Sequence, residues 1–396
     1  KRHAYPLPFE VPTDGGEYCV DVSFRLREAT SWAPAGHEVA WEQAVFTTPA
    51  FPDVHPASSA ADPAFPLVPA PTSSPVPASI SPLVIPAKAG IPAPDQRPDT
   101  TASRAPELIE GIHNVGVRGD HFSALFSRLY GGLVSYRYGP TPETGRELLR
   151  GVPKPNFWHA PTSNERGWGA PFADGPWLLA SRYAKVRVED PKVRVHDDAV
   201  EVRYTYCLPT TPSSECEVAY LVDADGRIEV TMTVRPGDGL ADLPEFGLLL
   251  TADADLRRLR WYGEGPEESY VDRRRGARLG VYSADVATQL TPYVRPQEAG
   301  SHTGVRWAEM TGDDGLGLRF DCAGGMEFSA LPWTPFEIEN ALHPNELPPI
   351  HRTVLRPALM RRGVGGDDSW GAQTHPEYRL PAGQELTFRF GFRGVG

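Results

Sequence analysis

The chain has 396 residues, 40% of them hydrophobic, and a formal net charge of −12. This length permits two or three domains with a sizeable core, and the acidic balance argues against nucleic acids and anionic membranes as partners. No stretch approaches the roughly 20 apolar residues that span a bilayer. The start Lys1-Arg2-His3 lacks Met and precedes no apolar signal core, so we expect a cytoplasmic location and the tail of a longer chain.

The region 1–48 contains one clear strand. In it, apolar residues alternate with polar or charged ones, namely Tyr18, Val20, Val22, Phe24 and Leu26. This period of two predicts a half-buried antiparallel strand. The region is too short for a complete sandwich, so we expect the last strands of a domain whose start is missing.

The region 49–105 is rich in Pro, Ala and Ser, with fourteen prolines between Pro49 and Pro98. Proline fixes φ and removes a backbone donor, so this density argues against both helix and sheet ladder. We predict an extended, disordered linker, most simply an inserted spacer. A proline-rich docking segment is the alternative.

The region 106–396 has a β pattern throughout, broken by Gly, Pro and Asp clusters, with no sustained helical period. Four runs alternate most clearly: Val200 to Tyr206, Ile228 to Val234, Leu316 to Cys322 and Phe388 to Phe392. The pattern predicts an all-β fold, a large antiparallel sandwich about twice the size of an immunoglobulin module. Four cysteines lack metal-ligand spacing, and we favour reduced thiols over a Cys207–Cys216 bridge.

Two further segments combine acids with basic residues. Glu264, Glu267 and Glu268 precede three arginines, and we favour a salt-bridge network over the carboxylate pair of a glycosidase. His302 and Glu298 are the acid–base pair that a sugar epimerase would require, and a surface pair is the plainer interpretation.

The segments 156–168 and 363–371 carry the chemistry that best fits a sugar. The first mixes aromatic residues with Asn, Glu and Arg, although it could equally be a connection with Trp158 in the core and Glu165 solvated. The second places Trp370 in a glycine-rich loop, where an indole either faces the apolar side of a sugar or folds back onto its own domain. Asp367 and Asp368 lack a third metal ligand, which favours capping of the turn.

These segments together resemble the C-terminal part of the β-galactosidases of glycoside hydrolase family 2. The matching runs keep the family's order and cover nearly all of 106–396, while 16–46 is similar to the end of the preceding immunoglobulin-like domain. The runs are 156–168, 243–247 (Leu-Pro-Glu-Phe-Gly), 261–273, 292–298, 305–307, 328–334, 343–348 and 363–370.

The resemblance implies a five-domain enzyme of which this chain carries the last domain, a galactose-mutarotase-like β-supersandwich, after a remnant of the fourth. In the family, the catalytic glutamates and the Mg and Na sites lie on a TIM barrel. Such a barrel needs ~250 residues of alternating strand and helix, so we assign no catalytic residue, metal or cofactor to this chain. The expected partners are a β-galactoside sugar and the catalytic large chain, in an oligomeric enzyme.

The resemblance further implies that Trp370 stacks on sugar at the aglycone side, with Asn164, Glu165 and Trp168 in a mobile segment near the substrate. Three features depart from the family: Ser163-Asn164-Glu165 replaces two acids flanking Asn, Arg361-Arg362 replaces smaller or uncharged residues, and the proline-rich insert is unfamiliar. We therefore expect part of a retaining β-galactosidase that acts on lactose and is inactive alone. The alternatives are a stand-alone carbohydrate-binding module, a sugar epimerase on the same fold, and a pseudogene-like remnant.

Overall fold

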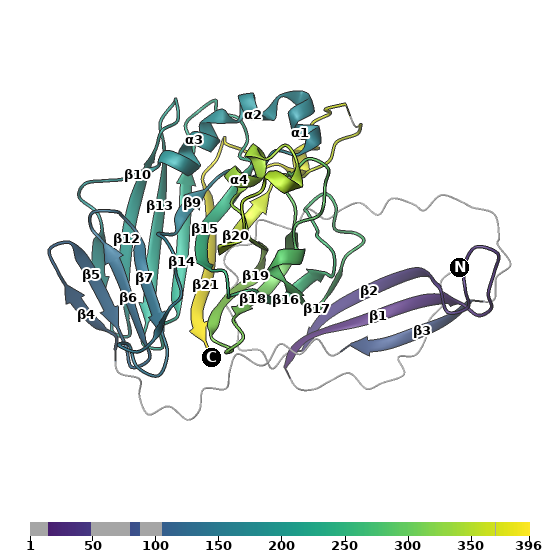
Figure 1. Cartoon of the computed structure of the whole chain (residues 1–396), viewed down its shortest axis with the longest axis horizontal. Helices are drawn as coiled ribbons and strands as arrows, with labels where there is room; N and C mark the ends of the chain where they lie inside the picture. Colours follow the sequence, from purple (N-terminus) through teal and green to yellow (C-terminus); the bar gives the residue numbers. More distant parts are fainter. Residues whose placement is uncertain (1–14, 49–79, 88–104, 369) are drawn as a thin grey trace. The chain divides into compact units, whose positions relative to one another are not determined.

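The computed structural model describes residues 15–48, 80–87, 105–368 and 370–396, with the backbone alone for 80–87. The chain divides into two compact units, Lys1–Pro98 and Asp99–Gly396, and each is considered by itself. Figure 1 shows the elements in chain order.

The first unit contains a three-stranded antiparallel sheet in the order β2-β1-β3, formed by β1 (Gly16–Leu26), β2 (Glu38–Thr48) and β3 (Ile80–Ala87). The alternating strand predicted around Tyr18 is β1, and the Tyr18 ring stacks on Phe46 of β2 with 5.7 Å between the ring centroids. Strand β3 lies inside the stretch predicted to lack regular structure, so that expectation is wrong for 80–87. Strand β3 is at the edge of the sheet, which is where prolines within sheets are found.

The second unit is built from a 13-stranded sheet and a 5-stranded sheet, and neighbouring strands pair antiparallel, as in β13 with β14. The all-β antiparallel prediction is confirmed. The small sheet contains β4 (Glu107–Glu110), β5 (Asn114–Arg118), β6 (Phe122–Ser127), β7 (Leu133–Tyr138) and β8 (Arg146–Glu147). The large sheet contains β9 (Lys154–Asn156), β10 (Lys185–Val186), β11 (Lys192–Val195), β12 (Ala199–Leu208), β13 (Ser214–Asp223), β14 (Ile228–Arg235), β15 (Glu245–Asp253), β16 (Arg258–Gly265), β17 (Arg278–Asp285), β18 (Ser301–Thr311), β19 (Gly317–Leu331), β20 (Arg352–Arg361) and β21 (Leu386–Val395).

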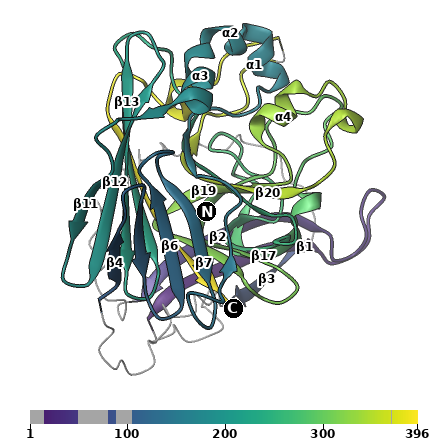
Figure 2. The same ribbon diagram turned by 60° about the vertical axis from the view of Figure 1, so that its left-hand side comes forward.

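The main core of this unit lies between the two sheets, where β6 and β7 face β12 and its neighbours (Figure 2). Phe126 of β6 packs against Tyr220 of β13, with 5.5 Å between the ring centroids. The buried Tyr136 of β7 packs against Phe392 of β21 and donates its hydroxyl to the Gly226 carbonyl at 2.8 Å. The alternating apolar residues that predicted the strands are therefore the residues that join the sheets.

Short helices gather at one end of the large sheet, beside the loop that follows β20 (Figure 1). Helix α1 begins with a capping box, in which the Thr162 hydroxyl accepts from Glu165 N and the Glu165 carboxylate accepts from Thr162 N. The segment 156–168, which was predicted to be a loop, therefore contains a helix. The sequence did not indicate this helix, because six residues are too few to show a helical period. The helices are α1 (Ser163–Trp168), α2 (Ala170–Ala173), α3 (Gly175–Tyr183) and α4 (Pro335–Asn340), with 3₁₀ turns η1 (Val286–Thr288), η2 (Pro344–Glu346) and η3 (Pro376–Tyr378).

A buried ion network crosses the large sheet beneath these helices. Arg356 of β20 binds Glu245 at 2.9 Å and Glu298 at 2.8 Å, and all three side chains are almost completely buried. Arg361 of the same strand binds Glu245 at 2.9 Å and lies 3.4 Å from Glu327. Because a buried charge without a partner is very costly, these residues depend on one another to stay inside the domain.

The substitution Arg356→Leu should therefore lower the free energy of unfolding by about 3–5 kcal/mol, since it strips a cation from two buried carboxylates. Urea unfolding followed by tryptophan fluorescence measures this change. The matched control Arg235→Leu, which breaks the exposed pair with Glu385, should cost less than about 1 kcal/mol. Equal costs for the two variants would contradict the importance given to the buried network.

Candidate functional site

The loop after β20 presents Trp370 to solvent, with the side chain 88% exposed. The Asp368 carboxylate accepts hydrogen bonds from the backbone N–H of Trp370 at 2.8 Å and of Ala372 at 3.1 Å. The Asp272 carboxylate similarly accepts from Gly365 N at 2.8 Å. The expectation that an acid in this loop caps the turn is confirmed, and the exposed indole is carried by a loop whose backbone is held in place.

Helix α1 packs directly against the C-terminal side of this loop. The Asn164 amide donates to the Ala372 carbonyl at 2.7 Å. Gly371 has φ +109°, and a Cβ there would lie 2.7 Å from the Gly167 carbonyl carbon. The two backbones approach each other this closely because both positions lack a side chain.

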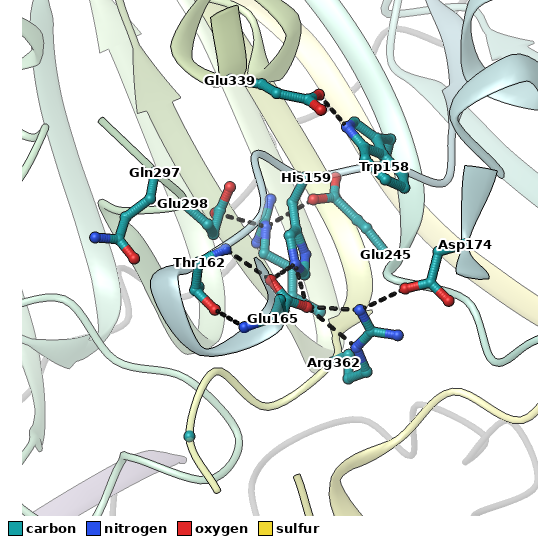
Figure 3. A network of polar contacts seen from close by, with 12 residues as sticks. Trp158, His159, Thr162, Glu165, Asp174, Glu245, Gln297, Glu298, Glu339 and Arg362 are labelled. Carbon is teal, nitrogen blue, oxygen red and sulfur yellow. Dashed lines mark hydrogen bonds and ion pairs between the residues drawn. The ribbon is translucent and has the colours of Figure 1, made fainter. Parts of the chain in front are cut away.

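A second buried ion network joins α1 to the start of the loop (Figure 3). Arg362 directly follows β20 and donates from Nη2 to Glu165 at 2.6 Å and to Asp174 at 2.8 Å. His159 lies 2.9 Å from the same Glu165 carboxylate. Glu165 is only 2% exposed, so the alternative that it is solvated is wrong.

The charges in this network shift one another's pKa values. Burial opposes protonation of His159, but the adjoining Glu165 carboxylate outweighs burial and raises the pKa of His159. Burial would likewise raise the pKa of Glu165, but His159 and Arg362 hold it well below its usual range. Burial raises the pKa of Asp174 although Arg362 opposes the shift. Glu165 is therefore ionised, and its carboxylate holds the Arg362 guanidinium and the His159 ring on either side.

Three of the four predicted site residues line one cavity of about 290 Å³, namely Asn164, Glu165 and Trp168. The fourth, Trp370, belongs to the same loop as the cavity residue Thr374 but is not part of the lining. Arg362 also lines the cavity, and its guanidinium carbon lies 5.1 Å from the centre of the Trp168 ring. In the sequence, Arg362 stands out only as a departure from the family, and Asp174 and Thr374 do not stand out at all. Residues that meet across the fold leave no local sequence pattern.

Two of the three candidate acids in 261–273, Glu264 and Glu268, have structural partners, whereas Glu267 is exposed. Glu264 accepts from Arg274 Nε at 3.0 Å, and Glu268 is paired with Arg273. Glu268 also accepts from Gly300 N at 2.7 Å. The favoured interpretation as a salt-bridge network is confirmed for Glu264 and Glu268.

The proposed His302–Glu298 acid–base pair is wrong, and so is its interpretation as a surface pair. Both side chains are buried, but His302 lies 2.8 Å from Gln289 and stacks on Trp261 with 4.0 Å between ring centroids, whereas Glu298 binds Arg356. Burial lowers the pKa of His302 to about 4. A neutral, stacked imidazole explains why this histidine tolerates the core.

Other sites considered from the sequence are absent from the described ranges. All four cysteines are free, so Cys207 and Cys216 form no bridge. No cluster of three potential metal ligands occurs in the part of the chain that the structure describes. In those same ranges, no helix is long and apolar enough to cross a membrane.

Comparison with models of known protein families shows which family the chain belongs to. Residues 118–392 match the family model "Beta galactosidase small chain", and residues 1–47 match "Beta-galactosidase, domain 4". The chain therefore belongs to the β-galactosidase small-chain family, preceded by the end of a β-galactosidase domain 4. The resemblance inferred from the sequence motifs is confirmed.

The relatives fall into two kinds. The β-galactosidase of Halalkalibacterium halodurans is 34% identical over 98% of this chain but 34% of its own length, and that of Streptococcus thermophilus is 35% identical over 98% and 32%. The chain thus spans about a third of the length of these relatives. The β-galactosidase small subunit of Latilactobacillus sakei is 35% identical over 72% of this chain and 96% of its own length.

Among solved structures, a galactose mutarotase related enzyme from Lactobacillus acidophilus covers 74% of this chain and 97% of its own. It is 9% identical with a TM-score of 0.39, and this degree of similarity supports no functional conclusion.

We expect Gly371→Ala to loosen the tryptophan loop, because a side chain at φ +109° is strained and would collide with Gly167. Hydrogen exchange followed by mass spectrometry should show faster exchange across 363–375 and a local cost of about 1–3 kcal/mol. The control Gly365→Ala, whose Cβ would meet only Asp272 Oδ2 at 3.4 Å, should leave exchange nearly unchanged. Indistinguishable exchange in the two variants would show that the close approach is not required.

The depressed pKa of His302 predicts a loss of stability in acid. The unfolded state binds a proton near pH 6.5 but the folded state only near pH 4, so stability from this group is present above about 6.5 and falls as pH drops towards 4. His302→Phe keeps a ring on Trp261 and removes the titration. The difference in unfolding free energy between wild type and variant should shrink from pH 7 to 5. A difference independent of pH would contradict the assignment.

Proposed function

We propose that this chain is the part of a retaining β-galactosidase that holds sugar on the leaving-group side of the bond, with lactose as substrate. The catalytic glutamates would lie on a TIM-barrel domain outside this chain. Membership of the small-chain family supports the proposal, as does the near-complete match to a relative that is itself named a small subunit.

The observation that carries the proposal is the exposed Trp370 on an anchored loop. An indole face packs on the apolar C–H face of a pyranose, and a fixed loop offers it at little conformational cost.

The acids of the described residues support placing catalysis elsewhere. Retaining hydrolysis needs two carboxyl groups ~5–5.5 Å apart, one of them a free nucleophile. The buried carboxylates Glu165, Glu245 and Glu298 are all bound to arginines. We accordingly place the Mg and Na ions expected for the family on the catalytic domain, and derive no step from them here.

A stand-alone carbohydrate-binding module is the second candidate, and the same exposed Trp370 favours it. An experiment can distinguish the two functions. A binding module binds galactosides in the absence of any partner chain, whereas a complementing chain contributes to hydrolysis only together with its partner. The epimerase alternative has lost its acid–base pair, since His302 and Glu298 bind different partners.

Hydrolysis of a chromogenic β-galactoside and of lactose should be measured with the chain alone, with a matching large β-galactosidase fragment, and with both mixed. Activity is expected only in the mixture. Trp370→Ala should then raise the KM for lactose about two- to tenfold, the value of one aromatic contact. Trp32→Ala removes another exposed indole, 65% exposed in the first unit, and should change nothing.

Activity from the chain alone would contradict the proposal and return Glu264, Glu267 and Glu268 to consideration as catalytic groups. Sugar binding by the isolated chain that is lost in Trp370→Ala, with no activity in any mixture, would favour the binding module instead.

A further inference from the structure

The loop that carries Trp370 is closed by a contact between two of its own side chains. His375 Nε2 lies 2.8 Å from Asp367 Oδ1. Asp367 precedes Trp370 in the loop and His375 follows it, so the contact spans the part of the loop that presents the indole. The backbone on the two sides also lies close together, because a Cβ on Gly366 would collide with the Ala372 carbonyl.

His375 faces a carboxylate from each of its ring nitrogens. Nε2 contacts Asp367, and Nδ1 lies 3.6 Å from Glu377 Oε1 in the turn η3. Arg379, the next charged residue along the chain, donates its Nε to the Thr374 carbonyl at 2.7 Å. A neutral imidazole carries one N–H, whereas the protonated ring carries two and is positively charged. The protonated form is therefore the one that attracts both carboxylates.

Other contacts fix the backbone of the loop. Asp368 accepts from two N–H groups of the loop, Asp272 accepts from Gly365 N, and Asn164 donates to a loop carbonyl. Imidazole is the side chain whose charge ordinarily changes between pH 5 and 8. His375 is therefore a contact through which pH in this range can change how firmly the loop is held.

The surroundings of His375 favour its charged form. The hydrogen bond to Asp367 and the charge of that carboxylate, with a smaller contribution from Glu377, raise the pKa of His375. When the loop opens, the imidazole returns to its ordinary pKa near 6.5. A group whose pKa is higher in the closed loop stabilises closure fully below about 6.5, and this contribution is lost as pH rises through the raised value. Closure should therefore weaken from mildly acidic to mildly alkaline pH.

We propose that His375 is a positioning residue, which in its protonated form binds Asp367 and Glu377 and so holds the loop that presents Trp370 to sugar. The side chains of His375 and Asp367 are 49% and 80% exposed, so water screens their attraction and the effect is local and small. The inference rests on the proposed function for the role of the indole in sugar binding. The hold of His375 on the loop does not depend on that role and can be measured in the chain alone.

Hydrogen exchange of residues 363–375 in the full chain, corrected for the pH dependence of the chemical exchange rate, tests the hold on the loop. Protection should be about two- to fivefold greater at pH 6 than at pH 8, the range expected of one exposed ion pair. His375→Gln should be weakly protected at both pH values. His375→Arg, which keeps a positive charge, should be protected at both.

The matched control is His343→Gln, which removes an exposed histidine that lies 3.0 Å from Glu346, outside the loop. Its loop should show the pH dependence of the wild type. Equal protection of the wild-type loop at pH 6 and pH 8 would overturn the proposal. A pH dependence that persists in His375→Gln would overturn it as well, because another group would then be responsible.

The effect on sugar is measured in the mixture of the chain with the matching large fragment. Dividing the KM for lactose of the wild type by that of His375→Arg removes the pH dependence of the catalytic groups that both share. This ratio should be near one at pH 6 and about two to five at pH 8, with similar kcat. A ratio that stays at one in an active mixture would overturn the positioning role.

Failure of the proposed function is distinguishable from failure of this inference. If no mixture hydrolyses a β-galactoside, the proposed function fails. The exchange experiment, which needs neither sugar nor partner, then decides by itself whether His375 holds the loop.

Discussion

The bond of Arg362 to Glu165 and Asp174 is the interaction on which the candidate site depends. It ties the residue that starts the tryptophan loop to helix α1 and to the start of α3. Because the three side chains are buried, none can leave without exposing an uncompensated charge to a low-dielectric interior. The loop that carries the exposed Trp370 is thereby attached to the body of the domain, although its own sequence is rich in glycine.

The rest of the domain provides a rigid base for this attachment. The two sheets share one core, and Arg356 and Arg361 of β20 bind buried glutamates from three other segments. Strand β20 therefore ends in a strongly anchored part of the sheet, and Arg362 follows at once. Rigid strands that carry an exposed functional loop are a common arrangement, because the loop can serve binding while the core serves stability.

The sequence predicted the parts of the fold that rest on local pattern. Phe388, Phe390 and Phe392 alternate in the sequence and in burial, and the strand they predicted is β21. Helix α1 was missed because it has six residues, and β3 because prolines on an edge strand resemble a linker.

Contacts between residues that are far apart in the chain could not be predicted from the sequence. Glu298 and His302 are neighbours in the chain, but Glu298 binds Arg356 from a distant strand. Glu165 was expected near the sugar. In the structure its carboxylate is bound to His159 and Arg362, beside the cavity. The roles of Trp370, Asn164, Glu165 and Trp168 in sugar binding stay predictions.

The central claim is that Trp370 meets sugar at a site completed by a partner chain. A photoreactive phenylalanine analogue placed at position 370 tests it most directly, in a mixture with the matching large fragment. We expect cross-linking to that fragment, and a loss of cross-linking when a non-hydrolysable galactoside fills the site. Cross-linking only within this chain, or cross-linking that the galactoside does not suppress, would show that Trp370 does not lie in a shared sugar site.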